Sequence, residues 1–313
     1  MNSWITKFLK PKIKSLFQKR SSENKENLWT TCECKNLIYK EDLQSNLNCC
    51  PKCGSHHKLT CNERFKIFFD NGEYELLDFP IPAEDPLGFS DIKKYTDRLN
   101  EAKRKTGQKD AVAIATGKIN GMDVTVGAQD FRFIGGSFST ASAEGFLHGA
   151  QHAIDNKNPF IFFSCTGGVR VMENLLSLSG MTKSVIAVRE LKKNRLPFIS
   201  VLTNPTAGGC TASYSTLGDV LIAEKGAIIA FAGARVISNT LKSNDLPMDF
   251  QKSEWVQEHG GLDLVLERKY IKSSITTLLN VLLKKAETQV NTDATNVVAI
   301  DEGLQKSFKS VRS

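Results

Sequence analysis

The sequence has no apolar run that approaches the length of a membrane helix. Its uninterrupted apolar stretches, such as residues 227–232, have the length of a strand, whereas a helix that spans a bilayer needs about 20 residues. The chain also lacks an apolar segment followed by the small-residue cleavage site of a secretory signal. We therefore expect no transmembrane segment and a cytoplasmic protein.

Motifs of several well-known enzyme classes are missing as well. The chain contains no G-x-x-x-x-G-K-[ST] phosphate loop, no G-x-G-x-x-G between a strand and a helix, and no G-x-S-x-G nucleophile elbow. His148 and His152 are spaced like the zinc-protease motif H-E-x-x-H, but Gly149 replaces its glutamate. These absences disfavour the corresponding nucleotide-binding and hydrolase folds, and we interpret both histidines as ordinary helix residues.

Cysteine is scarce after residue 61. Only Cys165 and Cys210 occur there, whereas the other six of the eight cysteines lie between residues 32 and 61. Cys210 directly follows Gly208-Gly209, where a helix N-terminus could lower its pKa and make it a nucleophile. We favour the alternative that Cys210 is a small apolar side chain packed under the turn, and we expect Cys165 in the core.

The clustered cysteines predict a zinc ribbon. Cys50-Pro-Lys-Cys53-Gly is a regular knuckle, and Cys32-Glu-Cys34, before a short apolar hairpin, is a knuckle with one residue fewer than usual. Tetrahedral zinc takes four thiolates, and a segment of about 30 residues has too small a core to fold without such a link. We predict that one structural zinc ion is bound by Cys32, Cys34, Cys50 and Cys53.

Two alternatives to this ligand set remain open at the level of sequence. Cys49, His56 or His57 could replace one of the four cysteines. The ribbon could also fold against the main domain without any metal. No disulfide framework is expected in either case, because a reducing cytoplasm keeps thiols free.

The rest of the chain has an α/β pattern. Its content of 41% hydrophobic and 24% charged residues is that of a globular protein. From residue 111 onward, short apolar runs alternate with helical stretches such as 141–154 and 172–191, which indicates strands that alternate with helices. Residues 62–110 are polar and predicted to be helical.

Two of the apolar runs end in paired glycines, Gly167-Gly168 and Gly208-Gly209, and each is predicted to open into a helix. Paired glycines let successive N–H groups point the same way, and a helix N-terminus adds partial positive charge. We therefore predict a site for a carbonyl oxygen that gains negative charge, as in an enolate. A phosphate site and simple close packing are the alternatives.

Basic charge is concentrated at the start of the chain. Of the net charge of +7, residues 1–27 contribute +5, and apolar residues lie among their lysines. We divide the chain into a basic amphipathic segment over 1–27, a four-cysteine zinc ribbon over 28–58, an α/β domain over 59–285 and a polar tail over 286–313.

Ordered motifs between Trp29 and Leu283 resemble the beta subunits of bacterial acetyl-CoA carboxylase carboxyltransferase. After the ribbon, these motifs are Lys94-Tyr95-Thr-Asp97-Arg98-Leu99, Thr106-Gly107-Gln-Lys-Asp110-Ala111, Phe133-Ile-Gly135-Gly136-Ser137, Thr166-Gly167-Gly168-Val-Arg170, Asn204-Pro205-Thr206-Ala-Gly208-Gly209, Gly218-Asp219 and Phe231-Ala-Gly233-Ala-Arg235-Val236-Ile237. The sequence departs from the family pattern at Val169 and Val171, where residues are usually smaller, and at Asn204, where aspartate is usual.

The resemblance implies a crotonase-like fold, in which backbone amides of repeated ββα turns hold the thioester oxygen of an acyl-CoA. It implies carboxyl transfer from carboxybiotin on a carrier protein to acetyl-CoA, which gives malonyl-CoA for fatty acid biosynthesis. The implied partners are the alpha subunit in an α2β2 heterotetramer, the biotin carboxyl carrier protein and biotin carboxylase. A chain without its alpha subunit should be inactive.

The resemblance also suggests roles for individual residues. It assigns Gly167, Gly168, Gly208 and Gly209 to the oxyanion region. It makes Lys93, Lys94 and Arg98 candidates for contacts with CoA phosphates or with another subunit. Arg170 and Arg235 could be ion-pair partners or catalytic groups, and the sequence does not separate these roles.

Two other functions remain as alternatives. A related subunit could act on propionyl-CoA, because one methylene changes specificity by only about 1–3 kcal/mol. A zinc-ribbon protein with a basic N-terminus could also bind nucleic acid weakly, through charge alone. Only the enzyme accounts for both glycine pairs.

Overall fold

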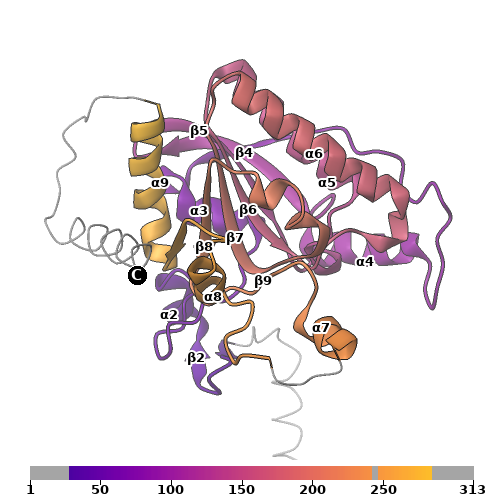
Figure 1. Cartoon of the computed structure of the whole chain (residues 1–313), viewed down its shortest axis with the longest axis horizontal. Coiled ribbons are helices and arrows are strands. Elements are labelled where there is room, and N and C mark those ends of the chain that lie inside the picture. Colours follow the sequence, from indigo (N-terminus) through magenta and orange to yellow (C-terminus); the bar gives the residue numbers. More distant parts are fainter. Residues whose placement is uncertain (1–27, 242–245, 284–313) are drawn as a thin grey trace, which may run out of the picture. The chain divides into compact units, whose positions relative to one another are not determined.

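The computed structural model describes residues 28–241 and 246–283. The predicted amphipathic segment over 1–27 and the predicted tail over 286–313 lie outside the described residues. The chain divides into two compact units between His57 and Lys58 (Figure 1). None of the described helices is both long and apolar enough to cross a membrane.

The smaller unit is built on a short hairpin. Strand β1 (Trp29–Thr31) pairs antiparallel with β2 (Leu37–Tyr39), and α2 (Lys40–Ser45) follows directly. The Trp29 and Tyr39 rings, which face each other across the hairpin, have centroids 5.3 Å apart. Among residues 28–57 of this unit, the buried residues are Cys32, Ile38, Leu43 and Cys50, a core too small to hold the fold by apolar burial alone.

The larger unit contains one eight-stranded mixed sheet, with the path β10-β8-β7-β6-β5-β4-β3 and β9 paired with β7. The strands are β3 (Tyr74–Leu77), β4 (Val112–Ile119), β5 (Met122–Gln129), β6 (Phe160–Thr166), β7 (Phe198–Ala207), β8 (Val220–Glu224), β9 (Ile229–Ala230) and β10 (Leu264–Leu266). Strands β5, β6, β7, β8 and β10 are parallel, whereas β3 and β4 run antiparallel to their neighbours. This arrangement confirms the predicted α/β class.

Helices α5 (Thr140–Asn156) and α6 (Leu175–Lys193) cover one face of this sheet (Figure 1). The Phe146 ring of α5 contacts the rings of Phe160 and Phe162 on β6 and of Phe198 on β7, with centroids 4.9–5.8 Å apart. All four rings are buried. Helix α6 packs on α5, and its buried Ala187, Val188 and Leu191 join the same core.

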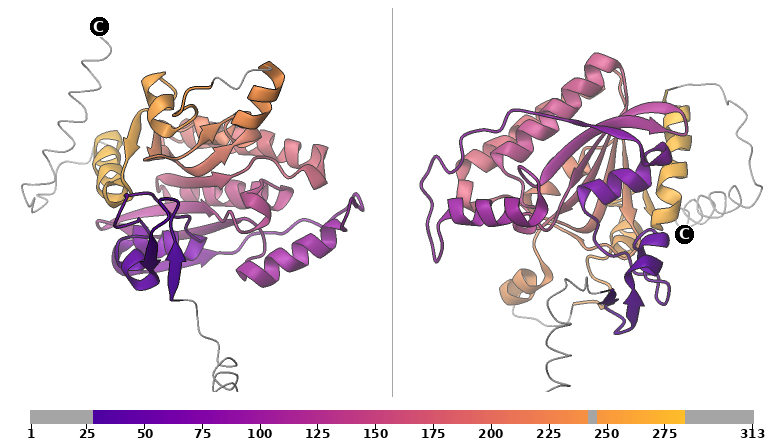
Figure 2. Two further views of the ribbon diagram at one scale, coloured as in Figure 1. Left: turned by 90° about the horizontal axis from the view of Figure 1, so that it is seen from below. Right: turned by 180° about the vertical axis from the view of Figure 1, so that it is seen from behind.

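Helices α3 (Cys61–Phe68) and α9 (Arg268–Leu282) lie on the opposite face, as Figure 2 also shows from two other directions. Because side chains alternate along a strand, Ile161 and Phe163 of β6 point to this second core. A capping box starts α3, in which the Thr60 hydroxyl accepts from the N–H of Glu63 and the Glu63 carboxylate accepts from the N–H of Thr60.

The structure corrects the sequence interpretation in three places. Residues 62–110, predicted to be helical, contain α3, α4 (Tyr95–Thr106) and the strand β3 between them. The helix predicted over 172–191 begins only at Leu175, because Asn174 has a φ of 48°. The second glycine pair opens into two 3-10 turns, Gly208–Cys210 and Tyr214–Thr216, rather than an α-helix.

Two further helices, α7 (Ala234–Leu241) and α8 (Ser253–Glu258), follow β9. The remaining 3-10 turns are Asp70–Gly72, Ile134–Gly136 and Val171–Glu173. The last two stand at the ends of β5 and β6, so the irregular turns of the larger unit gather where its central strands end. That edge is where ligands bind in open α/β sheets.

Candidate functional site

The two glycine pairs meet at the ends of β6 and β7. A methyl group on Gly208 would lie 2.9 Å from the Cα of Gly168, and one on Gly168 would lie 3.4 Å from the Cα of Gly208. Both residues also have positive φ, 68° at Gly208 and 126° at Gly168, which side chains disfavour. The close approach of the two backbones therefore requires glycine at position 208, and the backbone conformation favours it at position 168.

Three of the four predicted amides already have acceptors inside the protein. The N–H of Gly167 donates to the carbonyl of Gly135 at 2.9 Å. The N–H of Gly168 donates to Oγ1 of Thr166 at 2.9 Å, and the N–H of Gly208 donates to the carbonyl of Phe231 at 3.0 Å. These three hydrogen bonds hold the turns in place.

Two amides of neighbouring residues, Val169 and Gly209, remain without a hydrogen-bond acceptor among the described residues. Phe138 and Val169 form a parallel bridge. The N–H of Phe138 donates to the carbonyl of Gly168, and the N–H of Arg170 donates to the carbonyl of Phe138. The N–H of Val169 therefore faces away from Phe138. Within residues 28–241 and 246–283, neither this N–H nor that of Gly209 has an acceptor. A methyl group on Gly209 would lie 2.6 Å from Cγ2 of Val169, so the two residues are adjacent.

A third glycine pair, Gly135-Gly136, packs against the end of β6. Ile134, Gly135 and Gly136 have consecutive positive φ values of 46°, 65° and 63°. A methyl group on Gly136 would lie 2.0 Å from the carbonyl oxygen of Cys165, so only glycine fits. The sequence shows this pair only as part of a family motif; its contact with the end of β6 required the structure.

Arg170 lies under the Gly168 turn and is closed off from solvent, with a fully buried side chain. Its Nη1 is 2.7 Å from Oδ2 of Asp110, and its Nε donates to Oγ of Ser137 at 2.9 Å. Burial alone would raise the pKa of Asp110, but the Arg170 charge and hydrogen bonds from Ser139 and Ser142 hold that pKa below its ordinary value. Arg170 is thus a buried ion-pair partner; the side chain of Arg235 lies outside the described residues.

The two isolated cysteines are buried thiols. Cys210 is fully buried under the second turn, as predicted, with its Sγ 3.7 Å from Oγ1 of Thr166. Burial raises the pKa of the Cys210 thiol to about 11, and it raises the pKa of Cys165 to about 11 as well. Neither residue is a thiolate nucleophile at neutral pH.

Of the basic residues at the start of α4, Lys93 and Lys94 are exposed and Arg98 is partly exposed. Lys93 lies 2.5 Å from a carboxylate oxygen of Glu101, and Arg98 pairs with Asp91. Lys94 is the N-terminal cap residue of α4. All three lie within one turn of Tyr95, which is buried and faces Arg170.

The histidines of α5 have a structural explanation. Nδ1 of His152 lies 3.0 Å from the hydroxyl oxygen of Thr125 on β5. Burial lowers the pKa of His152 below its ordinary value, and the nearby His148 adds to this effect. Neither residue belongs to a group of metal-binding side chains in the described chain.

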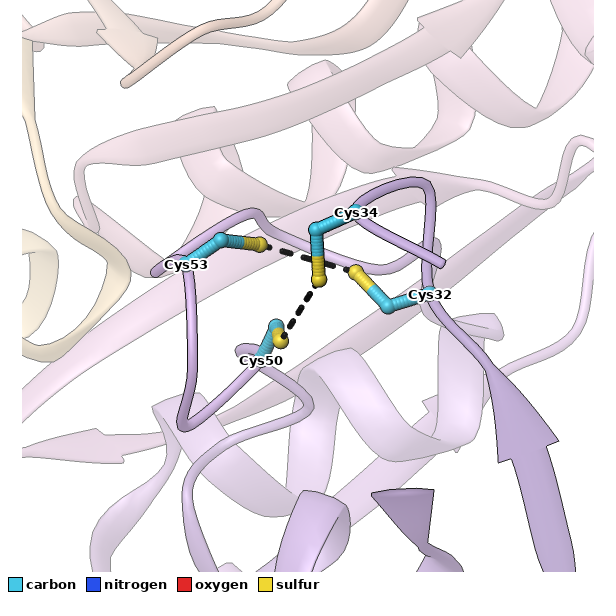
Figure 3. Close-up of side chains that lie close together, drawn as sticks. All are labelled: Cys32, Cys34, Cys50 and Cys53. Carbon is cyan, nitrogen blue, oxygen red and sulfur yellow. Dashed lines mark hydrogen bonds between the residues drawn. The ribbon is translucent and has the colours of Figure 1, made fainter. Parts of the chain in front are cut away.

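The four predicted zinc ligands do come together in the smaller unit. Their sulfur atoms all lie within 4.8 Å of one another, with Cys32 and Cys53 3.6 Å apart and Cys34 and Cys50 3.9 Å apart (Figure 3). Zinc–sulfur bonds of about 2.3 Å in a tetrahedron place sulfurs about 3.8 Å apart. The cluster therefore fits one structural zinc ion, and the short first knuckle is no obstacle.

The surroundings of these sulfurs differ. Hydrogen bonds from Ser55 lower the pKa of Cys53 to about 6, whereas burial raises the pKa of Cys50 to about 11. A metal ion favours the thiolate at all four positions, so binding would release protons. Cys49, His56 and His57, the alternative ligands, are not members of the cluster.

Comparison with known proteins identifies both units. A model of the carboxyl transferase domain matches residues 89–261, and one of the acetyl-CoA carboxylase zinc finger domain matches residues 29–53. The chain is 48% identical to the acetyl-coenzyme A carboxylase carboxyl transferase subunit beta of Pelagibacter ubique, covering 90% of this chain and 92% of the relative. It is 43% identical to the protein of that name from Brucella abortus, covering 93% and 95%.

Solved structures show the same fold at lower identity. A transcarboxylase 12S structure has a TM-score of 0.58 and 23% identity, and the match covers 77% of this chain and 43% of that one. A chain of the Pseudomonas malonate decarboxylase MdcD-MdcE hetero-dimer has a TM-score of 0.55 and 18% identity, and the match covers 78% and 95%. These neighbours confirm the crotonase-like carboxyltransferase fold expected for the larger unit.

Proposed function

The chain belongs to the family of acetyl-coenzyme A carboxylase carboxyl transferase beta subunits, and from this premise we propose that it binds acetyl-CoA and directs the transfer of a carboxyl group from carboxybiotin to form malonyl-CoA. The observation that carries the proposal is the pair of adjacent, unbonded amides of Val169 and Gly209. Two adjacent N–H donors suit a single oxygen that gains negative charge during the reaction.

The reaction removes a proton from the acetyl methyl group, and the carbon left behind bonds to the carboxyl carbon. Negative charge then builds on the thioester oxygen, and an amide donor aimed at it lowers the barrier by about 3 kcal/mol. Main-chain amides suit this task because they do not titrate near neutral pH. When its carrier docks, carboxybiotin would supply the carboxyl group by breaking its N–C bond, and the biotin left behind would take up the proton.

This assignment refines the roles of the four glycines. The N–H of Gly209 and the N–H of Val169 are the proposed oxyanion donors. Gly167, Gly168 and Gly208 keep the two backbones close together, because their own amides bond within the protein. Val169 departs from the family pattern, in which the residue at this position is usually smaller. Its proposed role uses only its backbone N–H, and a larger side chain does not remove that group.

The proposed site for the CoA phosphates is the start of α4. Lys93, Lys94 and Arg98 lie within one turn of Tyr95, whose hydroxyl contacts Arg170 next to the Gly168 turn. Their cationic groups are at least partly exposed at the surface. Surface pairs such as Lys93 with Glu101 contribute only about 0–1 kcal/mol. A phosphate can therefore displace the carboxylate partners at small cost.

The second half of the catalytic machinery is proposed to come from the alpha subunit, in an α2β2 assembly. Four apolar side chains form an exposed stripe along α6, the α6 apolar face, made of Leu175, Leu178, Val185 and Ile186. The same helix carries Met181, which a methyl group on Gly209 would meet at 2.8 Å. A subunit that covers this face would close over the amides.

The other proposed partners are the biotin carboxyl carrier protein, which would bring its biotin to the same edge, and biotin carboxylase. A reducing compartment, the cytoplasm, is proposed as the location because none of the eight cysteines, all within the described residues, forms a disulfide. The zinc ion has a structural role in the ribbon and takes no part in the transfer.

The experiment that tests the proposal measures malonyl-CoA formation from acetyl-CoA and carboxybiotin by this chain assembled with an alpha subunit. Gly209→Ala should reduce the rate at least about 100-fold, because the methyl group would lie 2.6 Å from Cγ2 of Val169 and 2.8 Å from Cε of Met181, so that the turn with both proposed donors has to shift. Gly233→Ala is the control, since a methyl group there meets no atom within 4 Å.

Propionyl-CoA is measured beside acetyl-CoA in the same assay. A fully assembled complex that carboxylates propionyl-CoA but not acetyl-CoA would refute the substrate assignment. Full activity in the Gly209→Ala complex would refute the role of the amide pair.

A further inference from the structure

Arg170 belongs to a buried network that also contains a tyrosine and two carboxylates. Its Nη1 lies 2.7 Å from Oδ2 of Asp110 and donates to the Tyr95 hydroxyl oxygen at 3.2 Å. The Tyr95 hydroxyl donates to Oε1 of Glu173 at 2.6 Å, and Oε2 of Glu173 accepts from the N–H of Thr140 at 2.6 Å. Tyr95 itself is 1% exposed, so it has no access to a ligand.

The network joins two parts of the proposed site. Tyr95 is the first residue of α4, and the basic residues proposed to hold the CoA phosphates lie within one turn of it. At the other end, Arg170 directly follows Val169, and its own N–H bonds to the carbonyl of Phe138. The phenol thus connects the start of α4 to the segment that carries the Val169 amide.

We propose that Tyr95 is a positioning residue that couples binding of the CoA phosphates at α4 to the placement of the Val169 N–H at the thioester oxygen. This inference rests on the proposed function. Binding energy from a remote part of a substrate increases rate only if the protein transmits it to the reacting centre. A buried chain of short hydrogen bonds between rigid elements is a suitable connection.

The test compares acetyl-CoA with acetyl-pantetheine, which has the thioester but lacks the nucleotide phosphates, using the assembled wild-type complex and the Tyr95→Phe complex. We expect Tyr95→Phe to lower kcat/KM for acetyl-CoA by about tenfold and to leave kcat/KM for acetyl-pantetheine within about twofold. Tyr74→Phe is the control, because Tyr74 is half-buried and packs on the core between the sheet and helices α3 and α9. This change should alter neither kcat/KM value.

The outcomes separate the inference from the function on which it rests. An equal loss with both substrates would show local damage to the turn, and no loss with acetyl-CoA would show no coupling; either result overturns the inference alone. An assembled wild-type complex that is inactive with both substrates overturns the proposed function and the inference with it. If Tyr95→Phe fails to fold, Glu173→Gln, which acts on the same hydrogen bond, is judged by the same comparison.

Discussion

Gly208 has no room for a side chain, because the backbone of Gly168 lies against it. The contact with Gly168 depends on how β6 and β7 pair, with Thr166 opposite Thr206 after a shift in register. The sequence identified both glycine pairs as turns at the ends of strands. It could not show which amides stay free, because the acceptors Gly135 and Phe231 come from distant segments.

Asp110 provides a prediction at the scale of one residue. Its folded-state pKa lies below the value of about 3.9 expected in the unfolded chain. The carboxylate therefore adds stability that is complete above about pH 4 and is lost as the pH falls through the folded-state pKa. Asp110→Asn should destabilise the protein by about 3–5 kcal/mol at pH 7, because Arg170 is left buried without its partner.

The measurement is the free energy of unfolding by urea between pH 7 and pH 3.5. The difference between wild type and Asp110→Asn should shrink at the acidic end of this range. Asp123→Asn is the control, since its ion pair with Lys118 is exposed and should matter by less than about 1 kcal/mol. A difference for Asp110→Asn that stays constant with pH would contradict the assigned ionisation.

At the scale of elements, periodicity predicted the central strands and the helices of the sheet, but it failed where irregular backbone intervenes. Strand β3 was missed because its four residues, Tyr-Glu-Leu-Leu, are as compatible with a helix as with an edge strand. The helix expected after Gly209 is replaced by 3-10 turns, so the proposed oxyanion donors there gain nothing from the dipole of an α-helix. The cysteine pattern, by contrast, identified all four members of the metal cluster.

The ribbon provides a prediction at this scale. Cys50→Ala should abolish binding of the one zinc ion and unfold β1 and β2, because the smaller unit has almost no other core. The cores of the larger unit contain no ribbon residue and should stay intact. Metal content and amide hydrogen exchange over 29–53 and 160–166 measure both effects.

Cys49→Ala is the matched control for this experiment. Cys49 is next to Cys50 in the sequence but outside the cluster, so the variant should keep its zinc. Zinc retained by Cys50→Ala, or exchange that rises as much over 160–166 as over 29–53, would refute a purely local structural role.

At the scale of the whole molecule, the solved structures show this fold in two contexts. The match covers 43% of the transcarboxylase 12S chain but 95% of the malonate decarboxylase chain, so this fold occurs both inside a longer chain and as a separate subunit. The family motifs were enough to predict a fold and a reaction. They could not predict the α6 apolar face, which became visible only when the buried side of α6 was known.

Assembly is the prediction at this scale. Leu175 and Leu178 are 68% and 50% exposed, so replacing both with glutamate should leave the melting temperature of the isolated chain unchanged. The same Leu175→Glu and Leu178→Glu double variant should weaken association with the alpha subunit by at least roughly 30-fold in sedimentation experiments. Val281→Glu, an equally exposed position on α9, should assemble normally, and unimpaired assembly of the double variant would exclude this face as the interface.

The amide pair of Val169 and Gly209 also has a consequence for inhibition. A compound that places an anionic oxygen between these two donors would be held by main-chain N–H groups, which only a substitution by proline removes. At the neighbouring Gly208 any side chain collides with the backbone of Gly168, and Gly168 itself has a φ of 126° that side chains disfavour. Resistance to such a compound would have to arise at the rim of the site, where side chains can change without loss of the reaction.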